Sequence, residues 1–239
     1  MIEVPERGRV FARPMRPGLG DCAPSGRIRL DALARWLQDI AYGDVEDVGL
    51  ENAAVWVVRR MRMHVERFPR FGEHLVVRTF CSGIGRMWAE RRTSIVRQGE
   101  AQADVEAVAL WVHLDPVARR PSPLTSAEME VYGGTGADRR VTARLRHPAP
   151  DGAKPSGGWR FRAADCDLAD HVNNAAYWAL LEEELIGGPD PVRMDVEIEF
   201  RTPAQPGDKQ ILADGTRRWI TDGSGETHAS FLLSQLEVD

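Results

Sequence analysis

The spacing of apolar residues predicts two amphipathic helices, one in each half of the chain. In the first half, four apolar residues fall at i, i+3, i+4 and i+7, which is the spacing of one buried helix face: Leu33, Trp36, Leu37 and Ile40. A second group has nearly the same spacing: Val172, Ala176, Ala179 and Leu180. We therefore expect helices near residues 30–43 and 171–185, each with one stripe to bury.

Alternating apolar and polar residues predict strands around these helices. The clearest segments are 76–80, 88–96 and 105–112, which are rich in β-branched and aromatic residues. One helix and several strands in each half predict an α+β fold, in which each helix packs on one face of a curved antiparallel sheet.

The two halves resemble diverged copies of one unit. DCAPSGRIRL, from Asp21, leads into the first helical stretch, and DCDLADHVNN, from Asp165, leads into the second. Between them RLRHPAPDGAKPSGG, from Arg144, is rich in proline and glycine and is typical of an exposed connection. We place an N-terminal unit at 1–145, a linker at 146–158 and a C-terminal unit at 159–239.

Composition narrows the function classes. The chain has 239 residues, 43% hydrophobic and 28% charged, which is the range of a folded globular protein. Its net charge of −5 argues against nucleic-acid and anionic-membrane partners, which need a basic surface.

The three cysteines have no CxxC spacing, and the N-terminus lacks the apolar run of a signal peptide. We expect a cytoplasmic protein with no nucleic-acid and no membrane partner.

The densest group of polar side chains precedes the second helix, in RAADCDLADHVNNAAYW from Arg162. Asp167 lies four residues before His171, and we expect His171, Asn173 and Asn174 in the first helical turn. The amides of that turn lack intrahelical acceptors and can stabilise an oxyanion. The alternative is ordinary loop chemistry, with Asp170 as an N-cap and the other polar residues exposed.

The pattern DxDxxxHVNNxxYW resembles the site segment of the hot-dog-fold acyl-carrier-protein thioesterases of plants and bacteria. The resemblance extends to WVVRRMRMHVERFPRFGEHLVV, from Trp56, and to ALWVHLDPVARRP, which ends at Pro121. It implies an α+β fold of two tandem hot-dog units, each a long central helix wrapped by an antiparallel β-sheet. It also implies that the acyl chain binds in the N-terminal unit and that the catalytic residues lie in the C-terminal unit.

By this resemblance the chain hydrolyses acyl thioesters of acyl carrier protein or coenzyme A and releases a fatty acid, with no cofactor and no metal. A carboxylate base and helix-terminal donors can perform this reaction without a covalent intermediate. Asp167 is expected to act as general base or nucleophile, and His171 as its partner. Asn173 and Asn174 are expected to hold the segment or the substrate carbonyl. A hot-dog dehydratase is disfavoured by the same segment, and homodimerisation is left open.

The chain departs from the plant pattern at three positions. Ala169 replaces an asparagine, and Pro203 and Ala204 replace a Glu-Cys pair. Two interpretations follow: an enzyme that uses Asp167 with Glu199 as a substitute second acid, or a catalytically weak acyl-binding hot-dog protein.

The remaining candidates concern the acyl chain and the partner. Three residues on the stripe of the first helix are candidates for substrate binding, although a closed core would also explain them: Trp36, Leu37 and Ile40. We expect the strand tryptophans 56, 88 and 111 to be core residues and 182–184 to be a solvated acidic face. The histidines show no ligand spacing, so no metal site is predicted. The arginines at 119, 120, 139, 140, 144 and 146 either guide an acidic carrier protein or are ordinary surface residues.

Overall fold

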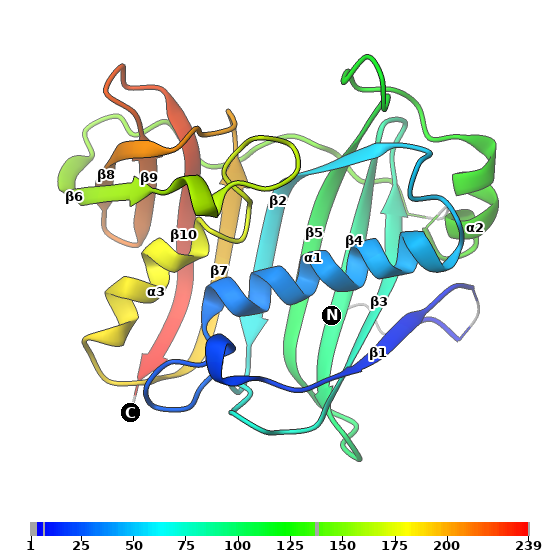
Figure 1. Cartoon of the computed structure of the whole chain (residues 1–239), viewed down its shortest axis with the longest axis horizontal. Helices are drawn as coiled ribbons and strands as arrows, with labels where there is room; N and C mark the ends of the chain where they lie inside the picture. The colour runs from blue at the N-terminus through cyan, green and yellow to red at the C-terminus, as the bar shows by residue number, and fades with distance from the viewer. Residues whose placement is uncertain (1–3, 7, 137–138, 239) are drawn as a thin grey trace.

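Two helices cover one face of a single antiparallel sheet with the strand order β1-β3-β4-β5-β2-β7-β10-β9-β8-β6 (Figure 1). This computed structural model describes residues 4–6, 8–136 and 139–238. The N-terminal unit supplies β1 (Phe11–Met15), β2 (Val55–Val65), β3 (Leu75–Ile84), β4 (Trp88–Arg97) and β5 (Ala103–Leu114). The C-terminal unit supplies β6 (Lys154–Phe161), β7 (Pro191–Phe200), β8 (Gly207–Asp214), β9 (Arg217–Thr221) and β10 (Thr227–Val238). The α+β class and the three predicted strand segments are confirmed.

The two units join at the centre of the sheet. β2 pairs antiparallel with β7, from Arg60 opposite Glu199 to Val65 opposite Met194. All strands of the first unit lie on one side of this pair and all strands of the second lie on the other. The apolar core is continuous between the sheet and the helices, so the units share one interior.

The first predicted helix is confirmed as α1 (Leu30–Asp47), which is somewhat longer than expected. Its predicted stripe is buried, with Trp36 5%, Leu37 3% and Ile40 1% exposed. The last residues of the helix pass beyond this stripe toward α2 (Ser126–Gly136), which packs against β3. Within the part of the chain that the structure describes, no helix is both long and apolar enough to span a membrane.

The second helix, α3 (Trp178–Ile186), begins later than the predicted residue 171. The residues before it form tight turns, in which Ala176 N–H donates to Asn173 O and Trp178 N–H to Ala175 O. Asn173 also accepts the Ala175 N–H through its side-chain oxygen at 2.8 Å. An asparagine side chain that bonds its own backbone in this way competes with helix formation. His171, Asn173 and Asn174 therefore precede the helix, and the prediction that they occupy its first turn is wrong.

The loops that enter the two helices share one backbone pattern. Ala23 N–H donates to Arg27 O at 2.8 Å, and Asp167 N–H donates to His171 O at 3.0 Å. The corner residues Gly26 and Asp170 both have positive φ, at 86° and 59°. The repeat inferred from the sequence is therefore present at the level of hydrogen bonds, with Ala23 in the place of Asp167.

A buried ion pair ties the two helices together. Glu182 of α3 lies 2.8 Å from Arg27, and the two side chains are 2% and 1% exposed. Glu182 also accepts the N–H of Leu30, the first residue of α1, at 2.9 Å. The predicted solvated acidic face is therefore wrong at Glu182, although Glu183 is exposed.

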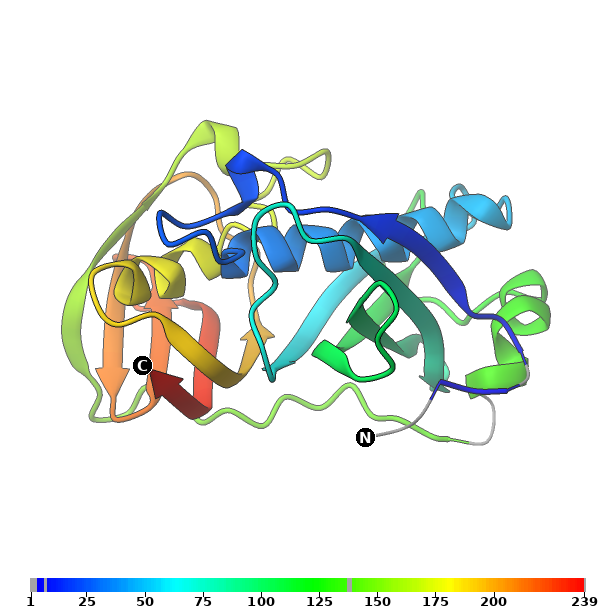
Figure 2. The same cartoon turned by 90° about the horizontal axis from the view of Figure 1, so that it is seen from below.

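The connection between the units crosses the face of the sheet opposite the helices (Figure 2). It is irregular from 139 to 153, but 154–158 of the predicted linker belong to β6. β6 is the last strand of the sheet and pairs only with β8 among the described strands. An edge strand tolerates Pro155, which cannot donate a backbone hydrogen bond.

Candidate functional site

A cavity of about 560 Å³ lies between α1 and the sheet, where the two units meet. This volume is within the range typical of small-molecule sites. Its walls include Gln38, Asp39 and Tyr42 of α1, Trp56 of β2, Trp111 of β5, and Asp167, Leu168, Ala169, Asn173 and Asn174 of the loop before α3. The C-terminal unit thus contributes polar side chains to a cavity that extends into the N-terminal unit.

Asp167 lies exposed on the cavity wall and is held by its own loop. One carboxylate oxygen accepts the Ala169 N–H at 2.9 Å. The other accepts a hydrogen bond from Asn173 Nδ2 at 3.0 Å. Because Asn173 is itself fixed by its bond to Ala175, it orients the carboxylate.

The loop is anchored from behind by Tyr177 and Ala204. Ala204, which is 0% exposed, donates its N–H to Tyr177 Oη at 3.1 Å and accepts the Val172 N–H at 3.0 Å. Burial raises the pKa of Tyr177 to about 12, so the phenol stays protonated. Ala204, at one of the positions that depart from the plant pattern, therefore supports the loop through its backbone.

The structure brings only some of the predicted residues to the cavity. Asp167, Asn173 and Asn174 line it, whereas His171 is half-buried outside the lining. The His171 carbonyl instead closes the loop by accepting the Asp167 N–H. Asp167 and His171 are therefore neighbours in the loop, but their side chains do not share the cavity wall.

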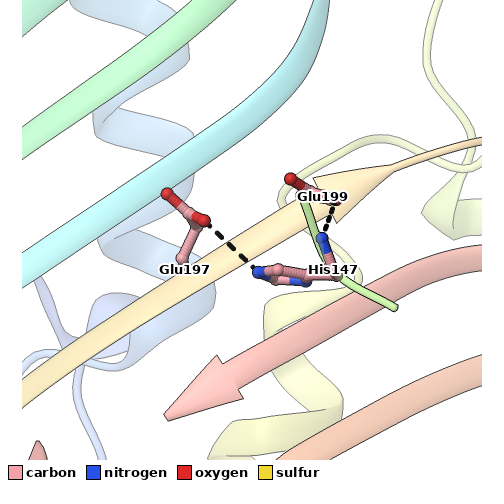
Figure 3. A group of neighbouring side chains, drawn as sticks. All are labelled: His147, Glu197 and Glu199. Carbon is pink, nitrogen blue, oxygen red and sulfur yellow. Dashed lines mark hydrogen bonds and ion pairs between the residues drawn. The ribbon is translucent and has the colours of Figure 1, made fainter. Parts of the chain in front are cut away.

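Glu199 lies on the opposite face of the sheet from the cavity. On β7, Val196 and Ile198 belong to the core between sheet and helices, so alternation directs Glu197 and Glu199 to the other face. There the Glu199 carboxylate accepts the backbone N–H of Arg146 at 2.6 Å. It also accepts the backbone N–H of His147 at 2.9 Å (Figure 3). The structure therefore does not place Glu199 beside Asp167 as a second acid.

His147, Glu197 and Glu199 form the one group among the described residues whose spacing could hold a metal ion. Their potential ligand atoms lie within 4.8 Å of one another. His147 Nε2 is 3.3 Å from Glu197 (Figure 3), and its Nδ1 is 2.9 Å from Ser230 Oγ. The contacts of Glu199 with the backbone of Arg146 and His147, and of the His147 ring with Ser230 and Glu197, hold the linker against the sheet, and we call His147, Glu197 and Glu199 the clasp.

Charges around the clasp keep Glu197 ionised. Burial raises the pKa of this carboxyl, but the hydrogen bond with His147 and the nearby Arg60 guanidinium outweigh burial. The pKa of Glu197 therefore lies below its ordinary value.

The predicted acyl-chain residues fill the core rather than the cavity. Trp36, Leu37 and Ile40 are absent from its lining, and a neighbouring stripe of α1 with Ala41 and Val45 lines it instead. The three strand tryptophans have different surroundings. Trp111 packs against the core, as predicted, and also lines the cavity, whereas Trp56 lines the cavity and is not part of the core, so its prediction is wrong. Trp88 is also outside the core and donates its indole N–H to Val141 O, in the irregular segment that follows α2.

Asp39 is a cavity carboxylate that the sequence interpretation missed. It lies on α1 and lines the same cavity as Asp167. Burial raises the pKa of Asp39, and the Arg35 guanidinium only partly offsets this effect. The feature of the sequence that could have indicated this residue is the polar pair Gln38 and Asp39, which interrupts an otherwise strongly buried helix.

Comparison with known proteins identifies the family. The model of the acyl-ACP thioesterase N-terminal domain matches residues 8–132. An uncharacterized protein of Mycobacterium tuberculosis is 27% identical over 87% of this chain and 83% of its own length. Oleoyl-acyl carrier protein thioesterase 2 of Arabidopsis thaliana is 23% identical over 66% of this chain, which spans half of that plant protein.

Solved structures show the same fold at low identity. A putative oleoyl thioesterase from Lactobacillus plantarum superposes with a TM-score of 0.79 at 18% identity, covering 98% of both chains. The 12:0-ACP thioesterase of Umbellularia californica gives 0.75 at 18% identity, covering 99% of this chain and 100% of its own. The architecture is thus the tandem hot-dog fold. Since the family model covers more than half of the sequence, the chain belongs to the acyl-ACP thioesterase family and is a thioester hydrolase.

Proposed function

We propose that this protein hydrolyses fatty acyl thioesters of acyl carrier protein at the cavity between the two units, with Asp167 as the general base. One observation carries the proposal: Asp167 is a carboxylate fixed by Asn173 on the wall of a largely apolar cavity. An acyl chain in this cavity places its thioester carbon beside the carboxylate.

The reaction needs an attacking water, a place for the negative charge and a proton for the leaving thiolate. Asp167 removes a proton as the water oxygen bonds to the thioester carbon. Asn174 lines the same cavity, and its amide can donate to the carbonyl oxygen as negative charge develops there. The C–S bond then breaks, and the thiolate takes up a proton.

Asp39 is our candidate for the proton donor. A carboxyl with a raised pKa keeps its proton to higher pH, and Asp39 of α1 lines the same cavity as Asp167. It takes the role that the sequence had suggested for Glu199. His171 has no direct role in this scheme, because its side chain is outside the cavity lining.

Coenzyme A thioesters present the same reacting carbonyl, so we expect them to be hydrolysed as well. The carrier protein adds contacts at the cavity opening but does not change the chemistry. The proposal therefore assigns carrier preference to KM rather than to the chemical step.

A direct assay tests this function. The purified chain is incubated with acyl carrier protein and coenzyme A thioesters, and both the fatty acid and the free thiol are measured. We expect equal amounts of acid and thiol, released repeatedly by each protein molecule. Binding of the thioesters with no release of acid above the uncatalysed rate would overturn the proposal and favour an acyl-binding protein.

A further inference from the structure

The cavity crosses the N-terminal unit away from Asp167. Its lining follows the order of strands in the sheet and ends at the helix that packs on β3: Trp56 of β2, Trp111 of β5, Arg91 of β4, Cys81 of β3 and Tyr132 of α2. An acyl chain that begins at Asp167 therefore points its methyl end toward β3 and α2.

The far end of the cavity is polar. Arg91 Nη1 lies 2.6 Å from Asp44 of α1, and these side chains are 11% and 1% exposed. The Arg91 guanidinium also lies 5.5 Å from the centre of the Tyr132 ring. Tyr132 is 6% exposed, and burial raises its pKa to about 12, so it stays neutral. Arg91 and Tyr132 line the cavity and Asp44 pairs with Arg91, and we call these three residues the polar end wall.

We propose that the polar end wall stops the acyl chain and selects medium-chain substrates of about ten to twelve carbons; this inference rests on the proposed function. The loop that carries Asp167 is bonded to Ala204, shortly after β7, whereas Arg91 lies on β4. In the order of the sheet β7 and β4 are three strand spacings apart, which amount to about 14 Å. An extended alkyl chain advances about 1.3 Å per carbon, given C–C bonds of about 1.5 Å. About eleven carbons therefore reach the wall.

The binding free energies favour a sharp upper limit on the length of the acyl chain. Each CH₂ group moved from water into the apolar cavity strengthens binding about fourfold, which corresponds to about 0.8 kcal/mol. A longer chain has to displace Arg91 from Asp44. Breaking such a buried pair weakens binding by more than 100-fold, or about 3 kcal/mol. Carbons beyond the wall are outside the apolar cavity and gain no such burial, so a longer chain does not offset that loss.

Saturated acyl thioesters of 8, 10, 12, 14 and 16 carbons test the limit through kcat/KM. We expect kcat/KM to rise up to ten or twelve carbons and to fall at least tenfold by sixteen. Arg91→Met makes the wall apolar while Asp44 keeps its partner Arg9 at 2.6 Å, so no buried charge is orphaned. This variant is expected to raise the ratio of sixteen-carbon to twelve-carbon activity about tenfold, and Tyr132→Ala is expected to shift the ratio in the same direction.

Arg92→Met is the matched control, because Arg92 is the next residue of β4 and alternation directs it to the opposite face, near Glu90. Its chain-length profile should equal that of the parent. A parent profile that still rises at sixteen carbons, or identical profiles in the parent, Arg91→Met and Tyr132→Ala, would overturn the inference while leaving thioester hydrolysis intact.

If no thioester is hydrolysed, the proposed function fails, and equilibrium binding then decides the inference separately. Free saturated fatty acids of the same lengths are titrated against the parent and Arg91→Met. Tightest binding at ten to twelve carbons in the parent, with longer acids preferred by the variant, supports the wall. A monotonic increase to sixteen carbons in both proteins contradicts it.

Discussion

At the scale of single residues, three side chains of one loop perform most of the proposed chemistry. The sequence could supply Asp167, Asn173 and Asn174, because their order within one short segment resembles a known site. The sequence could not show which of the side chains in this segment point into the cavity. A helix beginning at 171 would have directed His171 by helical geometry, whereas the loop closes on the His171 carbonyl and excludes its side chain from the cavity lining. Asp39 was missed because only the folded chain shows that α1 faces this loop.

The roles of Asn174 and His171 are separable by substitution. Asn174→Ala should lower kcat by a factor of about 10² to 10³, the usual effect of removing one donor to a developing oxyanion. His171→Ala should change kcat less than about threefold, a small effect for a side chain outside the cavity lining. Steady-state kinetics on one acyl thioester compares the two. A larger loss in His171→Ala than in Asn174→Ala would reverse these assignments.

At the scale of elements, the spacing of apolar residues predicts where one helix begins but not where the other does. α1 follows its apolar spacing because the stripe of Leu33, Trp36 and Leu37 coincides with the core face. α3 was predicted too long because the same spacing continues through turns stabilised by Asn173. The edge strand β6 was hidden inside a segment rich in proline and glycine, since only its pairing with β8 makes it a strand.

The contact between α1 and α3 should be important for stability. Glu182→Ala leaves the Arg27 guanidinium buried with only the partly exposed Asp190 as a carboxylate partner. We expect the free energy of unfolding to fall by about 3–5 kcal/mol, as when one partner of a buried ion pair is removed. Glu183→Ala, on the exposed side of the same helix, should change it by less than about 0.5 kcal/mol. Urea denaturation measures both, and equal values would show that the buried pair contributes nothing.

The clasp on the linker predicts a pH dependence of stability. The pKa of Glu197 is lower in the folded chain than its ordinary value, so its contribution is complete above that value and is lost as pH falls through the folded pKa. Glu197→Gln should reduce the free energy of unfolding at pH 7 by about 1.5–3 kcal/mol, the range for a hydrogen bond to a charged group. The difference from the parent should shrink when unfolding is measured below pH 4. A difference that stays constant between pH 7 and pH 3.5 would exclude this contribution.

At the scale of the whole molecule, the proposed function depends on both units. Each unit has the same entry loop, but only the second has a carboxylate, Asp167, where the first has Ala23, whereas the first contributes α1 and the strands that form most of the cavity. The repeat and the fold class could be recognised in the sequence because spacing and order are retained. The cavity could not, because its walls come from segments that meet only when β2 pairs with β7.

Delivery of a carrier-bound substrate should depend on arginines at the cavity opening. Arg119 is exposed and lines the cavity with Arg120 beside it, whereas Arg139 of the basic stretch is already paired with Glu90. Arg119→Glu with Arg120→Glu should raise KM for an acyl carrier protein substrate and spare the coenzyme A thioester, and added salt should reduce the difference.

Arg160→Glu, at the distant edge strand β6, is the control for this charge change. It should leave KM unchanged for both substrates. Equal increases for both substrates in the Arg119 and Arg120 variant would mean that these arginines do not bind the carrier.

The account as a whole depends on Asp167, and its most direct test compares two aspartates of the same loop. Asp167→Asn keeps the shape and the acceptor for Ala169 but removes the base. Asp170→Asn removes a neighbouring charge that does not line the cavity, at a positive φ that asparagine tolerates. We predict that kcat for acyl thioester hydrolysis falls by a factor of about 10² to 10⁴ in Asp167→Asn and stays within about twofold of the parent in Asp170→Asn, with both proteins folded. A folded Asp167→Asn protein that hydrolyses acyl thioesters at the parent rate would contradict the account.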